Sequence, residues 1–381
     1  MSVNKRMAET LNELADALEN GRAAFEPVIA FCDSGCELGT AEALEGARQA
    51  KRSGRRVLYI GPGSDSEVEC ITEPDPEKAH ARMQEALASG RAQAAVTMHY
   101  PFPLGVTTIG RVSAPASGRA MYVASTTGSI SSNRVEALLE NCVCGVAAAR
   151  ACGVAQPTVG IANIDGARKT ETILRALQRG GWDIRFAESG RTDGGVCLRG
   201  NDILSGCADV LLCDSLTGNL LTKILSAYSS GGGRETTGWG YGPGMGRSAS
   251  DLVLIVSRAS GAPVIAGAIE YAAELLRGGW KTYMQKEFAA ADAAGLRQEE
   301  ERLRAPKTES AAAPVSAPPK EILDCSILGV DVSSMEQAVE ALWKLGIYAE
   351  SAMGCTGPVI MVNHDREQAA RSALSAAGLI E

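Results

Sequence analysis

Short apolar runs alternate with longer amphipathic stretches along most of this chain. Residues 27–32 and 56–61 are almost entirely apolar, and each run precedes a stretch with apolar side chains at helical spacing, around 40–53 and 76–90. A short apolar run is typical of a strand buried on both faces, and its regular alternation with helices indicates a parallel sheet. The pattern therefore predicts an α/β fold built on a doubly wound, mostly parallel sheet.

The same alternation continues up to residue 304. Further strands are predicted at 93–98, 120–124, 157–162, 183–187, 209–213, 252–256 and 263–265. Further helices are predicted at 133–151, 167–180, 218–229 and 267–278. An amphipathic helix is expected at the start, over residues 1–20, and a charged helical segment at the end, over 278–304. With these two segments included, the predicted main domain spans residues 1–304.

The composition changes after residue 304. Residues 305–320 are rich in Ala, Pro, Ser and Thr, which is linker composition. Residues 321–381 then read as a small α+β unit with alternating short strands and helices. A unit of this size is near the lower limit for a self-sufficient core, so we expect it to dock on the main domain or on a partner.

Overall charge and cysteine content exclude several classes of protein. The chain of 381 residues has a net charge of -8, which argues against a nucleic-acid or anionic-membrane binder. No apolar run approaches the ~18–20 residues of a membrane span, and no signal peptide is evident, so a cytoplasmic location is expected. The eleven cysteines are expected to be free thiols. Only three histidines are present, and we expect no metal and no bound cofactor.

A hydroxyl-rich segment precedes the helix predicted at 133–151. Residues 125–132 consist of four serines, two threonines, one glycine and one isoleucine. A strand-to-helix turn of this kind offers backbone N–H groups and a helix N-terminus to an anion, with Thr126 and Ser129 as candidate ligands. The alternative is a plain helix cap formed by Ser131 or Ser132.

Two further predicted strand-to-helix turns carry polar side chains. Asn163 and Lys169 follow one strand, and we expect both to face the crevice at the carboxyl ends of the strands, where open α/β sheets bind ligands. His99 ends another strand and is expected to face the same crevice. As a local pattern, the Asn163 turn alone is a weak signal.

The strand at 209–213 leads into a third polar turn. Asp214 ends the strand, and Thr217 and Asn219 begin the helix. Asn219 and Lys223 are four residues apart and therefore share one helical face, which predicts a polar, partly cationic lip to the crevice. The alternative is that Asp214 serves only as a helix cap.

Residues 229–250 form a long glycine-rich segment that includes Arg234, Trp239, Tyr241 and Arg247. A segment this long is interpreted as a mobile lid or a partner-docking loop, with a disordered insertion as the alternative.

Cys355 lies in Gly354-Cys355-Thr356-Gly357-Pro358, in a predicted turn at a strand end. A thiol in such a turn is suited to form a covalent acyl intermediate, although free cysteines are also often buried structural residues. Backbone N–H groups of Thr356 and Gly357 are candidates for an anion nest that lowers the thiol pKa and holds the thioester oxygen. His99 is the candidate base, because His364 lies ~20–30 Å away along an extended strand.

These turns, in this order, resemble those of the bacterial phosphate acyltransferases of phospholipid synthesis, which are similar to phosphotransacetylases. The resemblance implies a phosphate acyltransferase/isopropylmalate dehydrogenase-like fold. It is carried by the stretches 159–164, 209–223 and 261–267. The segment 327–362, centred on Cys355, resembles more specifically the alpha subunits of component C of glycine/sarcosine/betaine reductase complexes.

The second resemblance implies an activity. In that family an acetyl thioester forms on the cysteine that matches Cys355, from a carboxymethyl selenoether carried by selenoprotein A. Inorganic phosphate, the expected substrate, then releases acetyl phosphate. The implied partners are the component C beta subunit and carboxymethylated selenoprotein A, in a hetero-oligomer. The alternatives are a non-catalytic scaffold subunit and a phosphate acyltransferase acting on another acyl thioester. A dehydrogenase is disfavoured because no early strand is followed by Gly-x-Gly-x-x-Gly.

Overall fold

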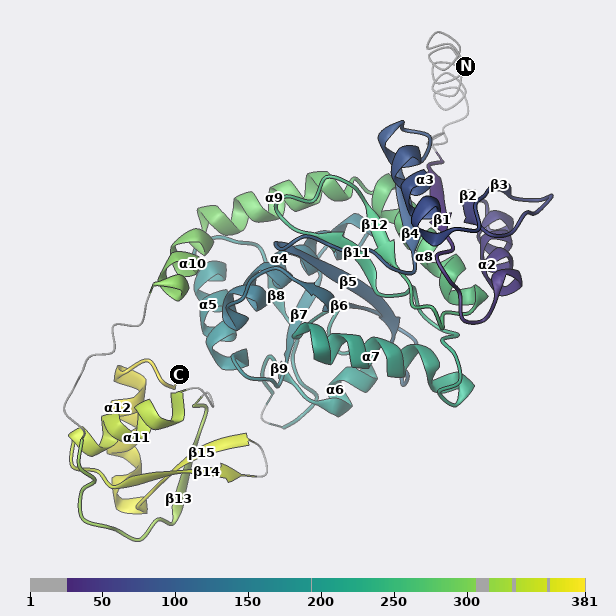
Figure 1. Ribbon diagram of the computed structural model, residues 1–381. Coiled ribbons are helices and arrows are strands. Elements are labelled where there is room, and N and C mark those ends of the chain that lie inside the picture. The colour runs from purple at the N-terminus through teal and green to yellow at the C-terminus, as the bar shows by residue number, and fades with distance from the viewer. Residues whose placement is uncertain (1–25, 193, 306–314, 331–333, 355–356, 381) are drawn as a thin grey trace.

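The computed structural model describes residues 26–192, 194–305, 315–330, 334–354 and 357–380 (Figure 1). The helix expected over residues 1–20 and most of the expected linker lie outside the described residues.

One large mixed sheet organises the described part of the main domain (Figure 1). Its strand order is β3-β2-β1-β4-β12-β11-β5-β6-β10-β7-β8, and β9 also pairs with β7. The strands are β1 (Val28–Cys32), β2 (Arg56–Gly61), β3 (Glu69–Thr72), β4 (Ala94–Thr97), β5 (Val106–Ser113), β6 (Ala120–Ser129), β7 (Thr158–Ala162), β8 (Arg185–Phe186), β9 (Cys197–Leu198), β10 (Val210–Leu212), β11 (Gly242–Met245) and β12 (Val253–Ile255). The predicted α/β class with a mostly parallel sheet is confirmed.

The two halves of this sheet run in opposite directions. Strands β3, β2, β1, β4 and β12 pair in parallel, and so do β6, β10, β7 and β8. Between the halves, the pairs β12–β11, β11–β5 and β5–β6 are antiparallel. Three successive reversals leave β6, β10 and β7 antiparallel to β4 and β12. The carboxyl ends of the two parallel sets therefore lie at opposite edges of the sheet, so the prediction of one shared crevice is wrong.

Helices cover both faces of the sheet, and alternate strand residues point to each face. Phe31 and Tyr59 belong to the buried cluster that includes side chains of α2, α4, α5, α8 and α9, whereas Ala30 and Leu58 belong to the cluster that includes side chains of α3. Helices α6 and α7 cover the second face beneath β6 and β10. The bounds are α2 (Thr40–Arg52), α3 (Pro76–Ala88), α4 (Arg134–Ala151), α5 (Ala167–Arg179), α6 (Gly200–Ser205), α7 (Ser215–Ala227), α8 (Ala262–Arg277), α9 (Trp280–Ala293) and α10 (Leu296–Arg304).

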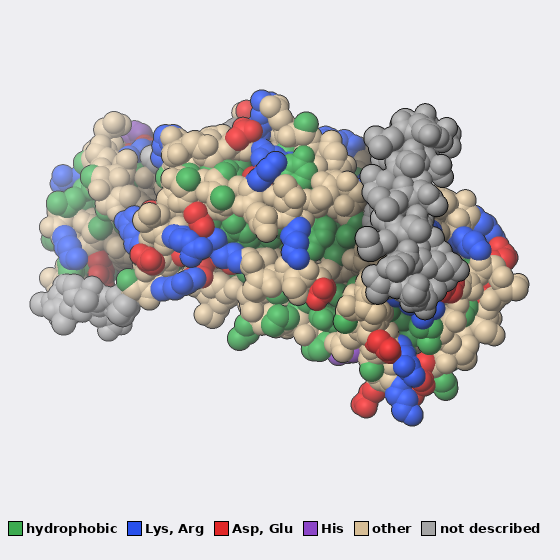
Figure 2. Space-filling model, turned by 90° about the horizontal axis from the view of Figure 1, so that it is seen from above, with side chains coloured by type: hydrophobic (Ala, Val, Ile, Leu, Met, Phe, Trp, Pro, Cys, Tyr) green, Lys and Arg blue, Asp and Glu red, His purple; other side chains and the backbone are tan. Residues whose placement is uncertain are grey.

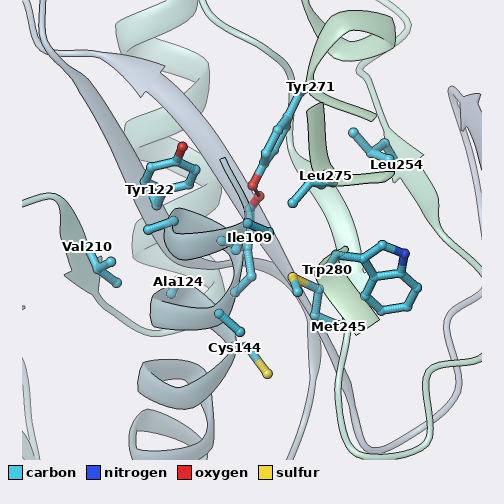
Figure 3. Packing of buried hydrophobic residues seen from close by; sticks show 14 of the residues in the cluster. Ile109, Tyr122, Ala124, Cys144, Val210, Met245, Leu254, Tyr271, Leu275 and Trp280 are labelled. Carbon is cyan, nitrogen blue, oxygen red and sulfur yellow. Dashed lines mark hydrogen bonds between the residues drawn. The ribbon is translucent and has the colours of Figure 1, made fainter. Parts of the chain in front are cut away.

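The largest core lies between the sheet and the helices α4 and α8 that cover one of its faces (Figure 3). Tyr122 of β6 and Tyr271 of α8 approach each other there, with ring centroids 6.1 Å apart. The Tyr271 hydroxyl donates a hydrogen bond to the backbone oxygen of Ile109 at 3.2 Å. Few aromatic residues are present, and small side chains such as Ala124 and Cys144 fill much of this core.

Part of the segment 229–250 is built into the sheet, so the segment is not one continuous loop. Its residues Gly242–Met245 form β11, a buried strand in the middle of the sheet between β12 and β5. Gly242 has a φ of 85°, and a Cβ there would lie 1.8 Å from the backbone oxygen of Ile109. The glycines of this segment therefore reflect close packing of backbone in the sheet as well as turns, which composition alone does not distinguish.

Two other local predictions are also wrong. Residues 263–265 form no strand but belong to α8, which begins at Ala262 with Pro263 in its first turn, where proline is favoured. The segment from Ser125 to Ser129 is the end of β6 rather than a turn. Asn133, not Ser131 or Ser132, caps α4, and its side chain accepts bonds from two backbone N–H groups of the first turn.

The C-terminal unit has its own antiparallel sheet, in the order β13-β15-β14, and its own core. Its elements are β13 (Cys325–Leu328), α11 (Met335–Lys344), β14 (Ala349–Gly354), β15 (Gly357–Val362) and α12 (Glu367–Ala376). The last residue of β14, Gly354, pairs with the first residue of β15, Gly357; Cys355 and Thr356 come between these two in the sequence. Both of these residues lie outside the described residues. The division at 305–320 stays a prediction.

Among the helices that the structure describes, none combines the length and the apolar character that crossing a lipid bilayer requires.

Candidate functional site

Helix α7 begins at one edge of the sheet with Asp214 as its N-cap. The Asp214 carboxylate accepts bonds from the backbone N–H of Thr217 at 2.9 Å and from its hydroxyl at 2.7 Å. Partial burial opposes ionisation of Asp214, but these hydrogen bonds outweigh it, and the pKa is lowered. The geometry of Asp214 and Thr217 is thus that of a helix cap, the alternative that the sequence left open; their role as ligands stays a prediction.

Asn219 and Thr126 fix α7 to the sheet. The Asn219 side-chain amide donates to the backbone oxygen of Thr126 at 3.2 Å. The Thr126 hydroxyl lies 2.6 Å from the backbone oxygen of Tyr241 and 2.6 Å from the hydroxyl of Thr108. The Thr126 hydroxyl thus links β6 to β5 and to Tyr241, the residue before β11. Because Thr126 is fully buried, this hydroxyl is not open to a ligand.

Lys223 lies about one turn beyond Asn219 on α7, at the centre of a polar cluster. Its Nζ is 2.6 Å from a carboxylate oxygen of Glu235 and 2.9 Å from the hydroxyl of Ser257. Glu235 is buried and also accepts bonds from Tyr241 at 3.1 Å and Ser260 at 2.7 Å. A buried carboxylate with three donors holds the Lys223 ammonium in place. The sequence did not reveal Glu235, because it lies in the segment interpreted as a lid.

A cavity of about 340 Å³ opens beside this cluster, and we call it the Lys223 cavity. It is lined by Lys223, Ile224, Ala227, Tyr228, Gly232, Gly233, Arg234, Glu235 and Ala259. The lining thus combines two cationic side chains, one buried carboxylate, apolar side chains and two glycines. The side chains of Lys223 and Arg234 are about half exposed, so both ammonium and guanidinium reach solvent beside the cavity.

A second cavity of about 170 Å³, which we call the Asn141 cavity, lies at the start of α7 and of α4. It is lined by Thr107, Ser125, Gly128, Ser129, Ile130, Ser131, Arg134, Ala137, Leu138, Asn141, Cys213, Asp214 and Ser215. Of the predicted ligands, Ser129 and Asp214 lie here, whereas Lys223 belongs to the other cavity. Sequence reasoning missed Thr107 and Asn141, because an isolated polar residue in an apolar strand or helix gives no distinct signal.

The remaining predicted residues are not brought together. Asn163 and Lys169 are exposed at the end of β7 and the start of α5, and they line neither cavity. His99 is exposed at the carboxyl end of β4. Because β4 pairs in parallel with β12, His99 lies on the edge of Ser257, opposite to the edge of Asp214 and Asn163. The expected grouping of His99 with Asn163 and Asp214 is therefore wrong.

The described cysteines are free thiols, as expected. Burial raises the pKa of Cys32, Cys152 and Cys197 to about 12, so these side chains stay protonated at neutral pH. Of the predicted acyl site, Gly357 lies at the start of β15, and the proposed roles of Cys355, Thr356 and Gly357 stay predictions.

One group of side chains in the described residues has the composition of a metal site. Cys325, His364 and Glu367 place their donor atoms within 4.8 Å of one another. Glu367 also pairs with Arg371 at 2.8 Å, which competes for its carboxylate. The absence of a metal stays a prediction.

Charges of both signs are interspersed on the face of the molecule seen in Figure 2. Mixed charge of this kind suits solvent contact and does not form an extended basic surface on that face.

Comparison with known proteins places these features in context. A sequence profile for the family described as "Fatty acid synthesis protein" matches residues 29–361. Over 381 residues, 99% of both chains, the sequence is 44% identical to the glycine/sarcosine/betaine reductase complex component C subunit alpha of Peptoclostridium acidaminophilum. Over 85 residues, 20% of this chain and 17% of the relative, it is 39% identical to a phosphate acyltransferase of Parasynechococcus marenigrum (strain WH8102).

Among solved structures, a branched-chain phosphotransacylase from Enterococcus faecalis V583 is similar with a TM-score of 0.44 and 14% sequence identity. That similarity covers 65% of this chain and 99% of the phosphotransacylase chain.

Proposed function

The chain belongs to the fatty acid synthesis protein family, and from this premise we propose that it is the acetyl phosphate-forming subunit of a glycine/sarcosine/betaine reductase complex. The observation that carries the proposal is the 44% identity to a component C alpha subunit over 99% of both chains. A match of this extent includes the C-terminal unit with Cys355 as well as the main domain.

The proposed reaction ends in acyl transfer from Cys355 to phosphate. A phosphate oxygen attacks the carbonyl carbon of an acetyl thioester on Cys355, the C–S bond breaks, and the thiolate leaves as the C–O bond of acetyl phosphate forms. A thioester is activated enough for its transfer to phosphate to conserve energy as an acyl phosphate. Cys32 and Cys152 are poor candidates for the acyl carrier, because burial raises their pKa to about 12 and a thiolate leaves less readily when its pKa is high.

We assign the phosphate to the Lys223 cavity. Phosphate is an anion, and Lys223 and Arg234 supply two cations there: Lys223 is paired with the buried Glu235, whereas Arg234 has only a long, half-exposed ion pair with Glu42 at 3.9 Å. Lys223 is held by Glu235 and Ser257, so it is positioned before a ligand arrives. Gly232 and Gly233 leave the wall free of side chains, and Ile224 and Tyr228 offer an apolar surface to the acetyl methyl group.

The alternative phosphate site is the turn that carries Asn163 and Lys169. Lys169 is exposed and lines neither cavity, so a bound anion there would remain fully hydrated and weakly held. The two lysines therefore form a matched pair for a test. Lys223→Gln is expected to raise KM for phosphate by about tenfold or more, and Lys169→Gln by less than about twofold.

The assay is acetyl phosphate formation by the full complex at varied phosphate concentration. Arg234→Gln is a second variant with little structural consequence, because the Arg234 side chain is half exposed and its nearest carboxylate, on Glu42, is 3.9 Å away. It is expected to raise KM for phosphate as well. A larger effect of Lys169→Gln than of both other substitutions would contradict the assignment.

A further inference from the structure

The Asn141 cavity contains two buried polar groups that have no hydrogen-bond partner. Asn141 is 3% exposed and Thr107 is 1% exposed. The side-chain oxygen of Asn141 and the hydroxyl of Thr107 are both without a partner, and both residues line the cavity. An unpaired buried polar group lowers stability, so native proteins pair nearly all of them with protein groups, water or ligand.

The volume of the cavity exceeds what one or two water molecules would occupy. Its volume is about 170 Å³. A single water needs only about 10–15 Å³ of such volume, so the space corresponds to roughly ten waters or to a small organic molecule. Side chains of Ile130, Ala137 and Leu138 form part of the wall, which favours a ligand with an apolar portion.

The order of the lining residues along α4 indicates which chemical groups a ligand would carry at its two ends. Arg134, Ala137, Leu138 and Asn141 occupy positions i, i+3, i+4 and i+7 and therefore form one stripe. The stripe is ~10 Å long at a rise of 1.5 Å per residue. A cation and a helix N-terminus lie at one end, an apolar wall in the middle, and the unpaired amide at the other end.

The cationic end is available to an anion. Arg134 forms an ion pair with Asp165 at 2.8 Å, but the side chains of both residues are more than half exposed. An exposed ion pair of this kind contributes little free energy and exchanges readily for another anion. The positive end of the α4 dipole adds to the attraction, because the N-cap Asn133 is uncharged and the one acidic residue of the first turn, Glu136, is paired with Arg304.

We propose that the Asn141 cavity binds a short-chain carboxylate of about four carbons that carries a hydroxyl group at its far end. The carboxylate pairs with Arg134 at the start of α4, the methylene groups contact Ala137 and Leu138, and the hydroxyl donates to the side-chain oxygen of Asn141. This site is separate from the Lys223 cavity, and the proposal does not depend on the function assigned above.

The test is a titration of the full-length chain with 4-hydroxybutyrate, butyrate and butan-1-ol by isothermal calorimetry and ligand-observed NMR. The expected order of affinity is 4-hydroxybutyrate, then butyrate, then butan-1-ol. Arg134→Gln is expected to weaken 4-hydroxybutyrate binding by about tenfold or more, as loss of a charged hydrogen bond does. Asp165→Asn is the matched control: it breaks the same ion pair but keeps the guanidinium, and binding is expected to stay or improve.

The far end of the site is tested by Asn141→Leu, which replaces the amide by an apolar group of similar size. This variant is expected to lose most of the preference for 4-hydroxybutyrate over butyrate, because the side-chain oxygen that accepts from the hydroxyl is gone. Thr107→Val is the second variant: it removes the other unpaired oxygen of the cavity, and the preference for 4-hydroxybutyrate is expected to persist because Asn141 remains.

The proposal is overturned if 4-hydroxybutyrate binds the parent chain and the Arg134→Gln variant equally. It is also overturned if none of the three compounds binds at millimolar concentration while Asn141→Leu raises the melting temperature, which would mean that the cavity holds water only.

Discussion

Replacement of Gly218 by alanine is a stringent test of how α7 is attached to the sheet. Gly218 lies in the first turn of α7, and a Cβ built there would be 1.8 Å from the backbone oxygen of Ser125 and 2.9 Å from the sulfur of Cys213. Real Cβ contacts are essentially never below 3.0 Å. The nearest obstacle is backbone, which cannot rotate away, so α7 or the end of β6 must move.

The expected cost follows from this contact. Overpacking of a close-packed site costs about 1–3 kcal/mol, and alanine regains about 1 kcal/mol over glycine in a helix, so we expect a net loss of up to about 2 kcal/mol. A shift of α7 also displaces Asn219 from the backbone oxygen of Thr126, to which it donates at 3.2 Å, and Lys223 from Glu235. The rate of acetyl phosphate formation is therefore expected to fall as well.

The assay is urea unfolding followed by circular dichroism, with Gly200→Ala as the control. Gly200 is also in the first turn of a helix, α6, but a Cβ there meets nothing within 4 Å. The control is expected to be neutral or slightly stabilising. Equal unfolding free energies for Gly218→Ala and Gly200→Ala would refute the reasoning.

Two other substitutions test the buried polar network. Burial raises the pKa of Glu140 to about 7 despite its bond to Arg247. Between about pH 5 and pH 7 the folded chain therefore holds a proton that the unfolded chain, in which the pKa of Glu140 is near 4.5, has lost. The free energy of unfolding consequently falls as the pH rises from about 5 to about 8. Glu140→Gln should reduce this fall by about 1–3 kcal/mol in urea titrations across that range, and an unchanged pH dependence would argue against a raised pKa. Trp182→Phe removes the indole bond to Glu287, which is 3.0 Å long and buried, and should lower the unfolding free energy by about 2–4 kcal/mol; a loss below about 0.5 kcal/mol would contradict the importance of that bond.

Much of the architecture could be predicted from the periodicity of the sequence. The strand at 27–32 and the helices at 133–151 and 167–180 are present within one or two residues, because continuous apolar runs and amphipathic stripes directly reflect burial. Residues 242–245 could not be recognised as a strand, since Gly-Pro-Gly-Met lacks the β-branched side chains that mark strands. Its place in the sheet depends on backbone contact with Ile109, a long-range feature.

The site was predictable in parts but not in its arrangement. Lys223 was identified from its turn and helix spacing, and it does line a cavity. Its partner Glu235 and the grouping of residues by sheet edge were not predictable, because strand direction depends on the antiparallel pairs formed by β11 and β5. A sequence motif places a residue at the end of a strand but does not say at which edge of the sheet that end lies.

The most direct test of the proposed function is the fate of the acetyl group on Cys355. The chain and its partner subunit are incubated with carboxymethylated selenoprotein A without phosphate, digested and analysed by mass spectrometry. We expect an acetyl group on the peptide that contains Cys355, and loss of acetyl phosphate formation in Cys355→Ala but not in Cys325→Ser, a control thiol in the same C-terminal unit. Acetyl phosphate formation by Cys355→Ala at the parent rate would contradict the account.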